Sequence, residues 1–245
     1  MGPRNTPALS IGSASVQDYV KTVYAFTEWQ DKPITASQLA GRLSIAASSV
    51  TEMVGKLVDL GLAEREKYGP IRLTPEGRRL ALAMVRRHRL LETFLVQELG
   101  YRWDEVHDEA EVLEHTVSDA FIERLDAKLG HPHRDPHGDP IPTADGHIRL
   151  PAAFPIATLD DGHRARLARV SDDDPEVLRY LSGRSVGLDV PLTVTGHRPF
   201  GGALAVVFDT AAGPAPVEVS DALAQALWVE TLEPHPGCVM PAAAG

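Results

Sequence analysis

Four side chains between residues 107 and 115 belong to the two residue types that most often bind divalent cations through nitrogen and oxygen. They are His107, Glu111, Glu114 and His115. At about 100° per residue, a helix brings these positions within roughly a third of a turn of one another. Imidazoles and carboxylates on one face can converge on one or two divalent ions. The same spacing also suits a solvated polar face that contains histidines, and the pattern alone leaves both interpretations open.

The element that would hold these four residues is one long helix, predicted over 103–129. Asp104 is its expected N-cap, and acids follow in the first turns, where the helix dipole favours negative charge. Apolar residues recur at the i, i+3, i+4, i+7 spacing of a buried face. The members of this predicted buried face are Val106, Ala110, Leu113, Val117, Ala120, Phe121 and Leu125.

The whole chain has the composition of a globular protein. Its 245 residues allow one to three domains, with 43% hydrophobic and 24% charged residues. No apolar run approaches the roughly 18 residues that span a membrane, and the start lacks a secretory layout. We therefore expect a cytoplasmic protein without a membrane partner. The single cysteine, Cys238, excludes a disulfide framework, so a metal site must use oxygen and nitrogen ligands.

Charge is distributed unevenly along the chain. The net charge is −10, but residues 1–94 carry 13 Lys/Arg against 9 Asp/Glu, whereas residues 95–245 carry 11 against 25. A basic N-terminal part is typical of proteins that meet a polyanion such as DNA.

The N-terminal part is predicted to be a helix-turn-helix. A first helix over 16–29 carries Asp18, and two short helices follow around a tight turn at Ser44, the first opened by Thr35 or Ser37. Small hydroxyl residues at the start of the last helix allow close approach to the major groove. The predicted DNA-facing residues of this recognition helix are Ala46, Ser48, Ser49, Thr51 and Lys56.

Two short strands around 68–70 are predicted to form a hairpin wing after this motif. The wing carries Arg65, Lys67 and Arg72, which are placed to contact phosphates. The alternative is a winged helix that contacts only protein.

A further helix is predicted from Thr74, as cap, to about Leu99. His88 and Glu92 are four residues apart and share one of its faces. Together with the helix over 103–129, it has more apolar surface than one small subunit can cover, and we infer a homodimer. An internal core is the alternative.

The remainder is predicted to be a linker and a small β-barrel. Residues 130–151 are rich in Gly, Pro, His and Asp, and Asp135 and His137 in this segment could fold back toward a metal. Short strands separated by turn residues follow from Phe154, which indicates an SH3-like barrel. The acids at 172–174 end its first strand and are most simply a capped acidic turn.

These features together resemble the diphtheria-toxin-repressor family of metal-dependent transcriptional regulators. The resemblance covers 16–232 and rests on HRLLE at 88–92, VHDEAEVLEH at 106–115, PHGDPIP at 136–142 and Asp18-Tyr19. It implies a mainly α protein with a small β domain: a winged helix-turn-helix, a helical dimerisation domain and an SH3-like barrel. We expect these domains at 1–75, 76–145 and 146–236, with a tail over 237–245.

The resemblance also implies two metal sites. The primary site falls on Asp18, Glu111, Glu114 and His115. The second falls on His88, Glu92 and His107, with Asp135, His137 and an acid of the SH3-like domain, Asp172, as further candidates. Iron-responsive members have methionine and cysteine at the positions of Asp18 and Glu111. Mn²⁺ is a hard cation low in the Irving–Williams order and needs carboxylate ligands, so these acids favour Mn²⁺, with Fe²⁺ as the alternative.

Lys21 is a departure from part of the family, because some two-metal manganese sensors carry glutamate there. This difference argues against a paired-metal primary site. Without metal, we expect the three primary-site carboxylates to repel one another and to disfavour docking of the first helix. Metal binding would reverse that repulsion and set the spacing of the recognition helices in a dimer.

The sequence is compatible with three classes of function. The first is a manganese-activated repressor that binds double-stranded operator DNA as a homodimer, with an iron-dependent repressor as its nearest alternative. The second is a metalloenzyme, since such clusters also support hydrolysis; no nucleophile, extra base or substrate loop accompanies the cluster, so we expect neither an enzyme nor a small organic substrate. The third is a metal-buffering or protein-interaction module.

Overall fold

The computed structural model describes residues 13–30, 32–66, 69–197 and 203–233. Two compact units are distinguished, and each is described by itself. The first comprises Met1–Leu91, Glu111–His131 and Ile141–Ile148, and the second comprises Glu92–Ala110, Pro132–Pro140 and Arg149–Gly245. Lys67, Cys238 and the expected tail lie outside the described residues. None of the helices in the described ranges is both long and apolar enough to cross a membrane.

The first unit begins with the predicted helix-turn-helix. Helices α1 (Ala14–Glu28), α2 (Ala36–Arg42) and α3 (Ala47–Asp59) enclose a core to which Val20, Leu39 and Val54 belong. Thr35 caps α2 through a reciprocal capping box with Gln38, which satisfies two otherwise unpaired donors. The turn between α2 and α3 contains Ser44 with a positive φ of 53°.

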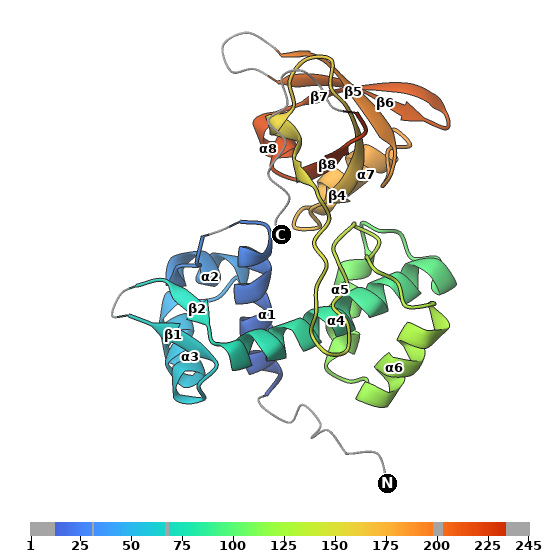
Figure 1. Cartoon of the computed structure of the whole chain (residues 1–245). Coiled ribbons are helices and arrows are strands. Elements are labelled where there is room, and N and C mark those ends of the chain that lie inside the picture. Colours follow the sequence, from blue (N-terminus) through green and yellow to red (C-terminus); the bar gives the residue numbers. More distant parts are fainter. Residues whose placement is uncertain (1–12, 31, 67–68, 198–202, 234–245) are drawn as a thin grey trace. The chain divides into compact units, whose positions relative to one another are not determined.

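The predicted wing is also present. Strands β1 (Ala63–Arg65) and β2 (Ile71–Leu73) pair antiparallel beside α3, as Figure 1 shows. The hydroxyl of Thr74 then accepts a hydrogen bond from the Gly77 amide and starts α4 (Pro75–Leu99). Gly77 is required at this position, because a Cβ there would lie 1.8 Å from the Leu62 carbonyl oxygen.

The prediction of a single long helix over 103–129 is wrong. The structure has α5 (Val106–Glu114) and α6 (Asp119–Lys128), separated at 115–118, and Ser118 caps α6 by accepting from the Phe121 amide. The break changes the phase of the buried face, so that Ile122 is buried and Phe121 is exposed. Asp104 precedes the start of α5 and is not its predicted cap; its carboxylate pairs with Arg102.

Two buried ion pairs tie the helices of the first unit together. The Arg89 guanidinium donates two hydrogen bonds, of 3.0 and 2.6 Å, to the Glu28 carboxylate and thereby joins α4 to α1. Arg86 of α4 donates to Asp126 of α6 at 3.0 Å and to the Pro142 carbonyl at 3.2 Å. These contacts fix the helices that carry the candidate ligands.

The second unit contains the expected small β domain. Its strands are β3 (Phe154–Pro155), β4 (Arg164–Val170), β5 (Pro191–His197), β6 (Leu204–Thr210), β7 (Gly213–Val219) and β8 (Leu227–Thr231). They form one antiparallel sheet in the order β3-β8-β4-β5-β6-β7, which is strongly curled in Figure 1. Alternate residues such as Leu167, Val206 and Phe208 fill its interior. Short helices η1 (Ile156–Thr158) and α8 (Asp221–Ala224) complete the domain.

A helix in this domain was not predicted. Helix α7 (Pro175–Ser182) follows β4, and Asp174 caps it by accepting from the Glu176 amide at 2.9 Å. The predicted capped acidic turn at 172–174 is therefore the start of a helix.

The linker residues of the second unit pack against β4. The Val170 amide donates to the His137 carbonyl at 2.9 Å, and Arg169 donates to Asp139 at 2.7 Å. Gly138 has a φ of +93°, and a Cβ there would lie 2.1 Å from the Ala168 carbonyl oxygen. Only glycine therefore permits this close approach, which fixes the backbone of His137.

Candidate metal centres

A first group of candidate ligands lies between α1 and α5 in the first unit. Ligand atoms of Asp18, Glu114 and His115 all lie within 4.8 Å of one another. His115 Nε2 is 2.8 Å from Asp18 Oδ1 and 3.4 Å from Glu114 Oε1. Glu111 joins an overlapping group with His88 and Glu114. The structure thus brings the predicted primary-site residues into two overlapping groups that share Glu114.

The end of α5 positions these ligands. Glu114 is the last residue of α5 and His115 the first beyond it. The Arg87 guanidinium donates to the carbonyls of Glu114 at 3.3 Å and Val117 at 2.7 Å, and it pairs with Asp119. These contacts provide partners for carbonyls that a helix end leaves unpaired, so Arg87 stabilises the break that follows Glu114.

The buried centre of this group is the Glu114 carboxylate, whose side chain is 0% exposed. Its Oε1 accepts from Lys21 Nζ at 2.7 Å, and its Oε2 lies 2.6 Å from His88 Nδ1. Burial raises the pKa of Glu114, but the hydrogen bonds from His88 and Lys21 outweigh burial and hold the pKa below its ordinary value. Glu114 therefore carries a negative charge at neutral pH.

Lys21 brings a positive charge into the group. Its ammonium contacts Glu111 Oε1 as well as Glu114 Oε1. Burial lowers the pKa of Lys21, but these two carboxylates outweigh burial and raise it. The predicted repulsion among the three carboxylates is thus incomplete, because Lys21, one turn along α1 from Asp18, compensates part of their negative charge.

Asp18 supplies the test of whether this group fits a metal ion. Its Oδ1 is buried and accepts no hydrogen bond from the residues that the structure describes, although His115 Nε2 is close. Burial raises the pKa of Asp18, opposed by the nearby His115 and Lys21. A buried carboxylate oxygen without a donor, beside an imidazole nitrogen, is an arrangement that a divalent cation would satisfy.

Gln17 orients the imidazole of His115. Its side-chain Oε1 lies 2.9 Å from His115 Nδ1. An amide oxygen only accepts hydrogen bonds, so Nδ1 carries the proton in this contact and the lone pair of a neutral ring lies on Nε2, toward Asp18. A partner on the far nitrogen is a common feature of histidines that bind metals. The sequence interpretation did not include Gln17.

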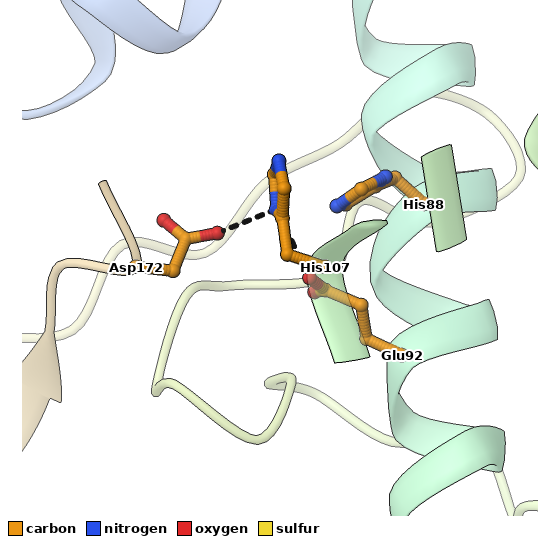
Figure 2. A group of neighbouring side chains, drawn as sticks. All are labelled: His88, Glu92, His107 and Asp172. Atoms are coloured by element: carbon orange, nitrogen blue, oxygen red, sulfur yellow. Dashed lines mark ion pairs between the residues drawn. The ribbon is translucent and has the colours of Figure 1, made fainter. Parts of the chain in front are cut away.

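A second group of candidate ligands lies in the second unit. His107 Nδ1 is 3.0 Å from Asp172 Oδ2 and 3.5 Å from Glu92 Oε1, and Glu92 is 1% exposed. Figure 2 shows the His107 ring between these two carboxylates, with His88 one helical turn before Glu92 on α4. Asp172 stands in the turn between β4 and α7, so the β domain contributes to this group.

The linker adds Asp135 and His137 to the surroundings of Glu92. Ligand atoms of Glu92, Asp135 and His137 lie within 4.8 Å of one another, and all three residues are buried. His137 Nε2 contacts the Trp103 carbonyl at 2.7 Å, and its Nδ1 lies 3.8 Å from Glu92 Oε2. This buried Nδ1 forms no hydrogen bond within the described ranges. The Glu92 carboxylate is the acidic group that lies near it.

The charges of this second group favour cations strongly. Burial lowers the pKa of His107, but hydrogen bonds with Asp172 and Glu92 outweigh burial and raise it to about 11. Burial also lowers the pKa of His137, and the nearby Glu92 and Asp135 raise it to about 9. Both rings thus hold protons in an acidic environment, and each must release one before it binds a metal ion.

The predicted DNA-facing residues lie on the accessible side of α3. Ala46, Ser48, Ser49, Thr51 and Lys56 are all exposed. In the wing, Arg72 is exposed, whereas Arg65 is half-buried and donates from Nε to the Gly69 carbonyl at 3.2 Å. Arg65 therefore also holds the wing in shape. The third predicted wing cation, Lys67, is outside the described residues.

A winged helix joined to helices that gather carboxylates and imidazoles defines a class of metal-responsive DNA-binding proteins. Residues 13–71 match the family "Iron dependent repressor, N-terminal DNA binding domain". Residues 74–143 match "Iron dependent repressor, metal binding and dimerisation domain", and residues 154–231 match "FeoA domain". The expected fold class, with its SH3-like C-terminal domain, is confirmed.

Relatives cover most of the chain. It is 30% identical to the diphtheria toxin repressor of Corynebacterium glutamicum over 226 residues, which are 88% of this chain and 95% of the relative. It is 34% identical to the iron-dependent repressor IdeR of Mycobacterium tuberculosis over 166 residues, which are 67% and 70% of the two chains. The chain belongs to the diphtheria toxin repressor family of metal-dependent transcriptional repressors, and it is not an enzyme.

Solved structures of manganese-dependent proteins are similar as well. One is a manganese-dependent transcriptional repressor in complex with manganese, with 50% sequence identity and a TM-score of 0.84, covering 89% of this chain and all of that chain. Another is the manganese regulator SloR, with 34% identity and a TM-score of 0.74, covering 88% and 98%. The similar proteins thus include both iron-dependent and manganese-dependent repressors.

Proposed function

We propose that this protein is a manganese-activated repressor that binds operator DNA as a homodimer. The observation that carries the proposal is the ligand chemistry of the primary cluster, defined as Asp18, Glu111, Glu114 and His115. These residues offer carboxylate oxygens and one imidazole, with no sulfur atom among them. Mn²⁺ competes poorly for soft ligands and is best held by hard oxygen donors. The 50% identity to a manganese-dependent repressor supports the same metal.

Fe²⁺ is the alternative activator, because IdeR is named as an iron-dependent repressor. The type of donor atom, oxygen or sulfur, distinguishes a site for Mn²⁺ from a site for Fe²⁺. A site for Fe²⁺ or the later divalent metals gains from sulfur donors, whereas Asp18 and Glu111 give hard oxygens. We therefore place Mn²⁺ first.

We propose the second group as an additional metal site, called here the second cluster: Glu92, His107, Asp135, His137 and Asp172. Its support is the short His107–Asp172 contact and the buried Nδ1 of His137 directed at Glu92. Glu92 is central because it lies near both imidazoles. The family resemblance assigns His88 to this site as well. His88 lies one turn before Glu92 on α4, and within the first unit its Nδ1 contacts Glu114 of the primary cluster.

The regulatory link runs through α1. Asp18 lies on α1, which also contributes Val16, Val20 and Val23 to the core of the DNA-binding domain. A divalent cation supplies positive charge that holds Asp18 close to Glu114 and His115 of α5. Ligand binding that couples two elements must change operator affinity and metal affinity reciprocally. The exposed residues of α3 and the wing are the proposed DNA contacts.

Homodimer formation is supported by apolar side chains that one chain leaves uncovered. Val112 of α5 is 68% exposed and Phe121 of α6 is 44% exposed. Residues 74–143 match a dimerisation domain. Two recognition helices in a symmetric pair fit two half-sites of an operator. We propose domains at 1–75, 76–145 and 146–236, which the three matched ranges support.

The test is operator binding measured against free Mn²⁺, Fe²⁺, Co²⁺ and Zn²⁺, using the protein's own promoter region. We expect Mn²⁺ to activate at the concentrations that a cell maintains, and Glu114→Gln to abolish the response. Activation by Fe²⁺ alone would show that iron, and not manganese, is the activating metal. DNA affinity that no metal changes would contradict the proposal and favour a buffering role.

A further inference from the structure

Lys21 occupies a position in the primary cluster that a cation would otherwise take. Its Nζ contacts one oxygen each of Glu111 and Glu114, and its side chain is only 13% exposed. Lys21 lies three residues after Asp18 on α1, so both residues face α5. The chain thus places an ammonium group and a candidate metal ligand side by side on one helix.

The ammonium changes the net charge of the primary cluster. Asp18, Glu111 and Glu114 contribute three negative charges, and Lys21 reduces the sum to −2. One divalent ion then neutralises the cluster, with His115 as a neutral ligand. A second divalent ion would leave an excess of two positive charges in a partly buried site, which is strongly unfavourable.

We propose that Lys21 is a resident cation of the primary cluster, which limits the cluster to one divalent ion and holds α1 against α5 before that ion binds. This inference rests on the proposed metal site and adds its stoichiometry and its metal-free state. The Lys21 contacts join α1 to α5 directly, because Glu111 and Glu114 both belong to α5. Metal binding in this chain therefore acts on helices that are already in contact.

The position of the ammonium also explains how a first ion can still enter. Asp18 Oδ1 and His115 Nε2 do not contact Lys21 in any described hydrogen bond. They lie 2.8 Å apart, and His115 Nε2 is 3.4 Å from Glu114 Oε1. One ion can be held by Asp18, Glu114 and His115, with Glu111 as a further ligand through Oε2, while the ammonium remains on Glu111 Oε1. A second ion would need the position that the ammonium itself occupies, between Glu111 Oε1 and Glu114 Oε1.

Every protein in the experiment carries His107→Ala and Asp172→Asn, which disable the second cluster. In this background, the wild-type Lys21 is compared with Lys21→Glu, Lys21→Met and Lys21→Arg. Equilibrium dialysis counts bound Mn²⁺, and electron paramagnetic resonance distinguishes an isolated Mn²⁺ from a spin-coupled pair. We expect one isolated ion in the wild type and Lys21→Arg, and a second, weakly held ion in Lys21→Met, which lacks the ammonium. We expect a coupled pair in Lys21→Glu, where a fourth carboxylate replaces the ammonium.

Thermal unfolding in chelator supplies the second measurement. Lys21→Met and Lys21→Glu should melt several degrees below the wild type, because the buried Glu114 loses its ammonium partner, while Lys21→Arg should retain most of the wild-type stability. Saturating Mn²⁺ should restore the two weakened variants, since a ligand stabilises the state that binds it. If either variant fails to fold, the wild type and Lys21→Arg still report the stoichiometry.

Two results would overturn the inference. One is a spin-coupled Mn²⁺ pair in the primary cluster of the wild type. The other is an unchanged melting temperature of Lys21→Met in chelator. Failure of the proposed function would look different: the wild type would bind one isolated ion with the expected Lys21 effects, yet operator affinity would not depend on it.

Discussion

Gln17 Oε1 lies 2.9 Å from His115 Nδ1, on the side of the ring opposite Asp18. The amide thereby fixes the tautomer in which Nε2 can accept a metal ion. We expect Gln17→Leu to weaken Mn²⁺ binding at the primary cluster by about 10–100-fold, the usual cost of losing a partner behind a metal ligand. Isothermal titration in a background without the second cluster measures this change.

Gln30 provides the matched control for that variant. Gln30 is exposed and lies beyond the end of α1, and its side-chain amide donates a hydrogen bond to the Phe26 carbonyl. Gln30→Leu should leave Mn²⁺ affinity unchanged. Equal affinities of the two variants would show that Gln17 does not orient His115.

Lys56 is expected to contact DNA phosphate, because it is exposed on α3. Lys56→Ala should weaken operator binding for all sequences and reduce the slope of log affinity against log salt by about 1. Its Mn²⁺ affinity should stay at the wild-type value. Fluorescence anisotropy over a salt series measures the slope, with Lys128→Ala of α6 as the control. A loss of metal binding in Lys56→Ala would contradict the separation of DNA and metal surfaces.

Much of the helical framework follows from the sequence, because its signals are local. The Thr74-Pro75-Glu76 start of α4 and the Thr35 cap of α2 were predicted from residue types. The same signals were present where the prediction failed. Asp174-Pro175-Glu176 opens α7 as Thr74-Pro75-Glu76 opens α4, and Ser118 caps α6.

The break between α5 and α6 was not predictable from spacing alone. Apolar residues keep their helical period through 115–118, so periodicity continues across the break. Arg87, a residue of α4, stabilises the break through hydrogen bonds from its guanidinium to two carbonyls there. Such a contact joins residues far apart in sequence.

The candidate ligands could be named from their types and from the family resemblance, but their surroundings could not. Lys21 and Gln17 flank Asp18 on α1, and each matters only because α1 packs against α5. A sequence shows that a lysine follows Asp18 by three residues. It does not show which carboxylates that lysine will contact.

Asp172 is expected to hold a metal ion in the second cluster together with His107 and Glu92. Asp172→Asn should weaken the second Mn²⁺ by more than the roughly 10–100-fold that loss of an outer partner costs. The first Mn²⁺ should bind as in the wild type. Asp173→Asn is a neighbouring control, and unchanged binding of the second ion in Asp172→Asn would exclude Asp172 as a ligand.

Asp126 should make folding stability depend on pH. Burial raises its pKa, but hydrogen bonds from Arg86 and His131 outweigh burial and hold it below the ordinary 3.8. A depressed pKa contributes stability that is complete above the unfolded value and is lost as the pH falls through the folded value. We expect Asp126→Asn to cost about 1.5–3 kcal/mol at neutral pH.

Below pH 3.8 the difference between wild type and Asp126→Asn should shrink. Urea unfolding in chelator at several pH values measures it. Glu123→Gln is the control, because Glu123 is 60% exposed and lies 3.5 Å from Arg86, so it should change stability little. A stability difference that stays constant down to pH 2 would refute the assignment.

Asp18 and Glu111 are expected to determine the metal selectivity of the primary cluster. Both give hard carboxylate oxygens to the primary cluster, so we expect the double change Asp18→Met with Glu111→Cys to shift selectivity toward Fe²⁺ or Co²⁺. The wild type should bind its operator at Mn²⁺ concentrations to which the double variant no longer responds. The introduced methionine and cysteine should each cost less than roughly 1 kcal/mol of helix stability. Circular dichroism checks that the double variant is folded. A folded double variant that keeps the wild-type order of metals would show that these carboxylates do not select manganese.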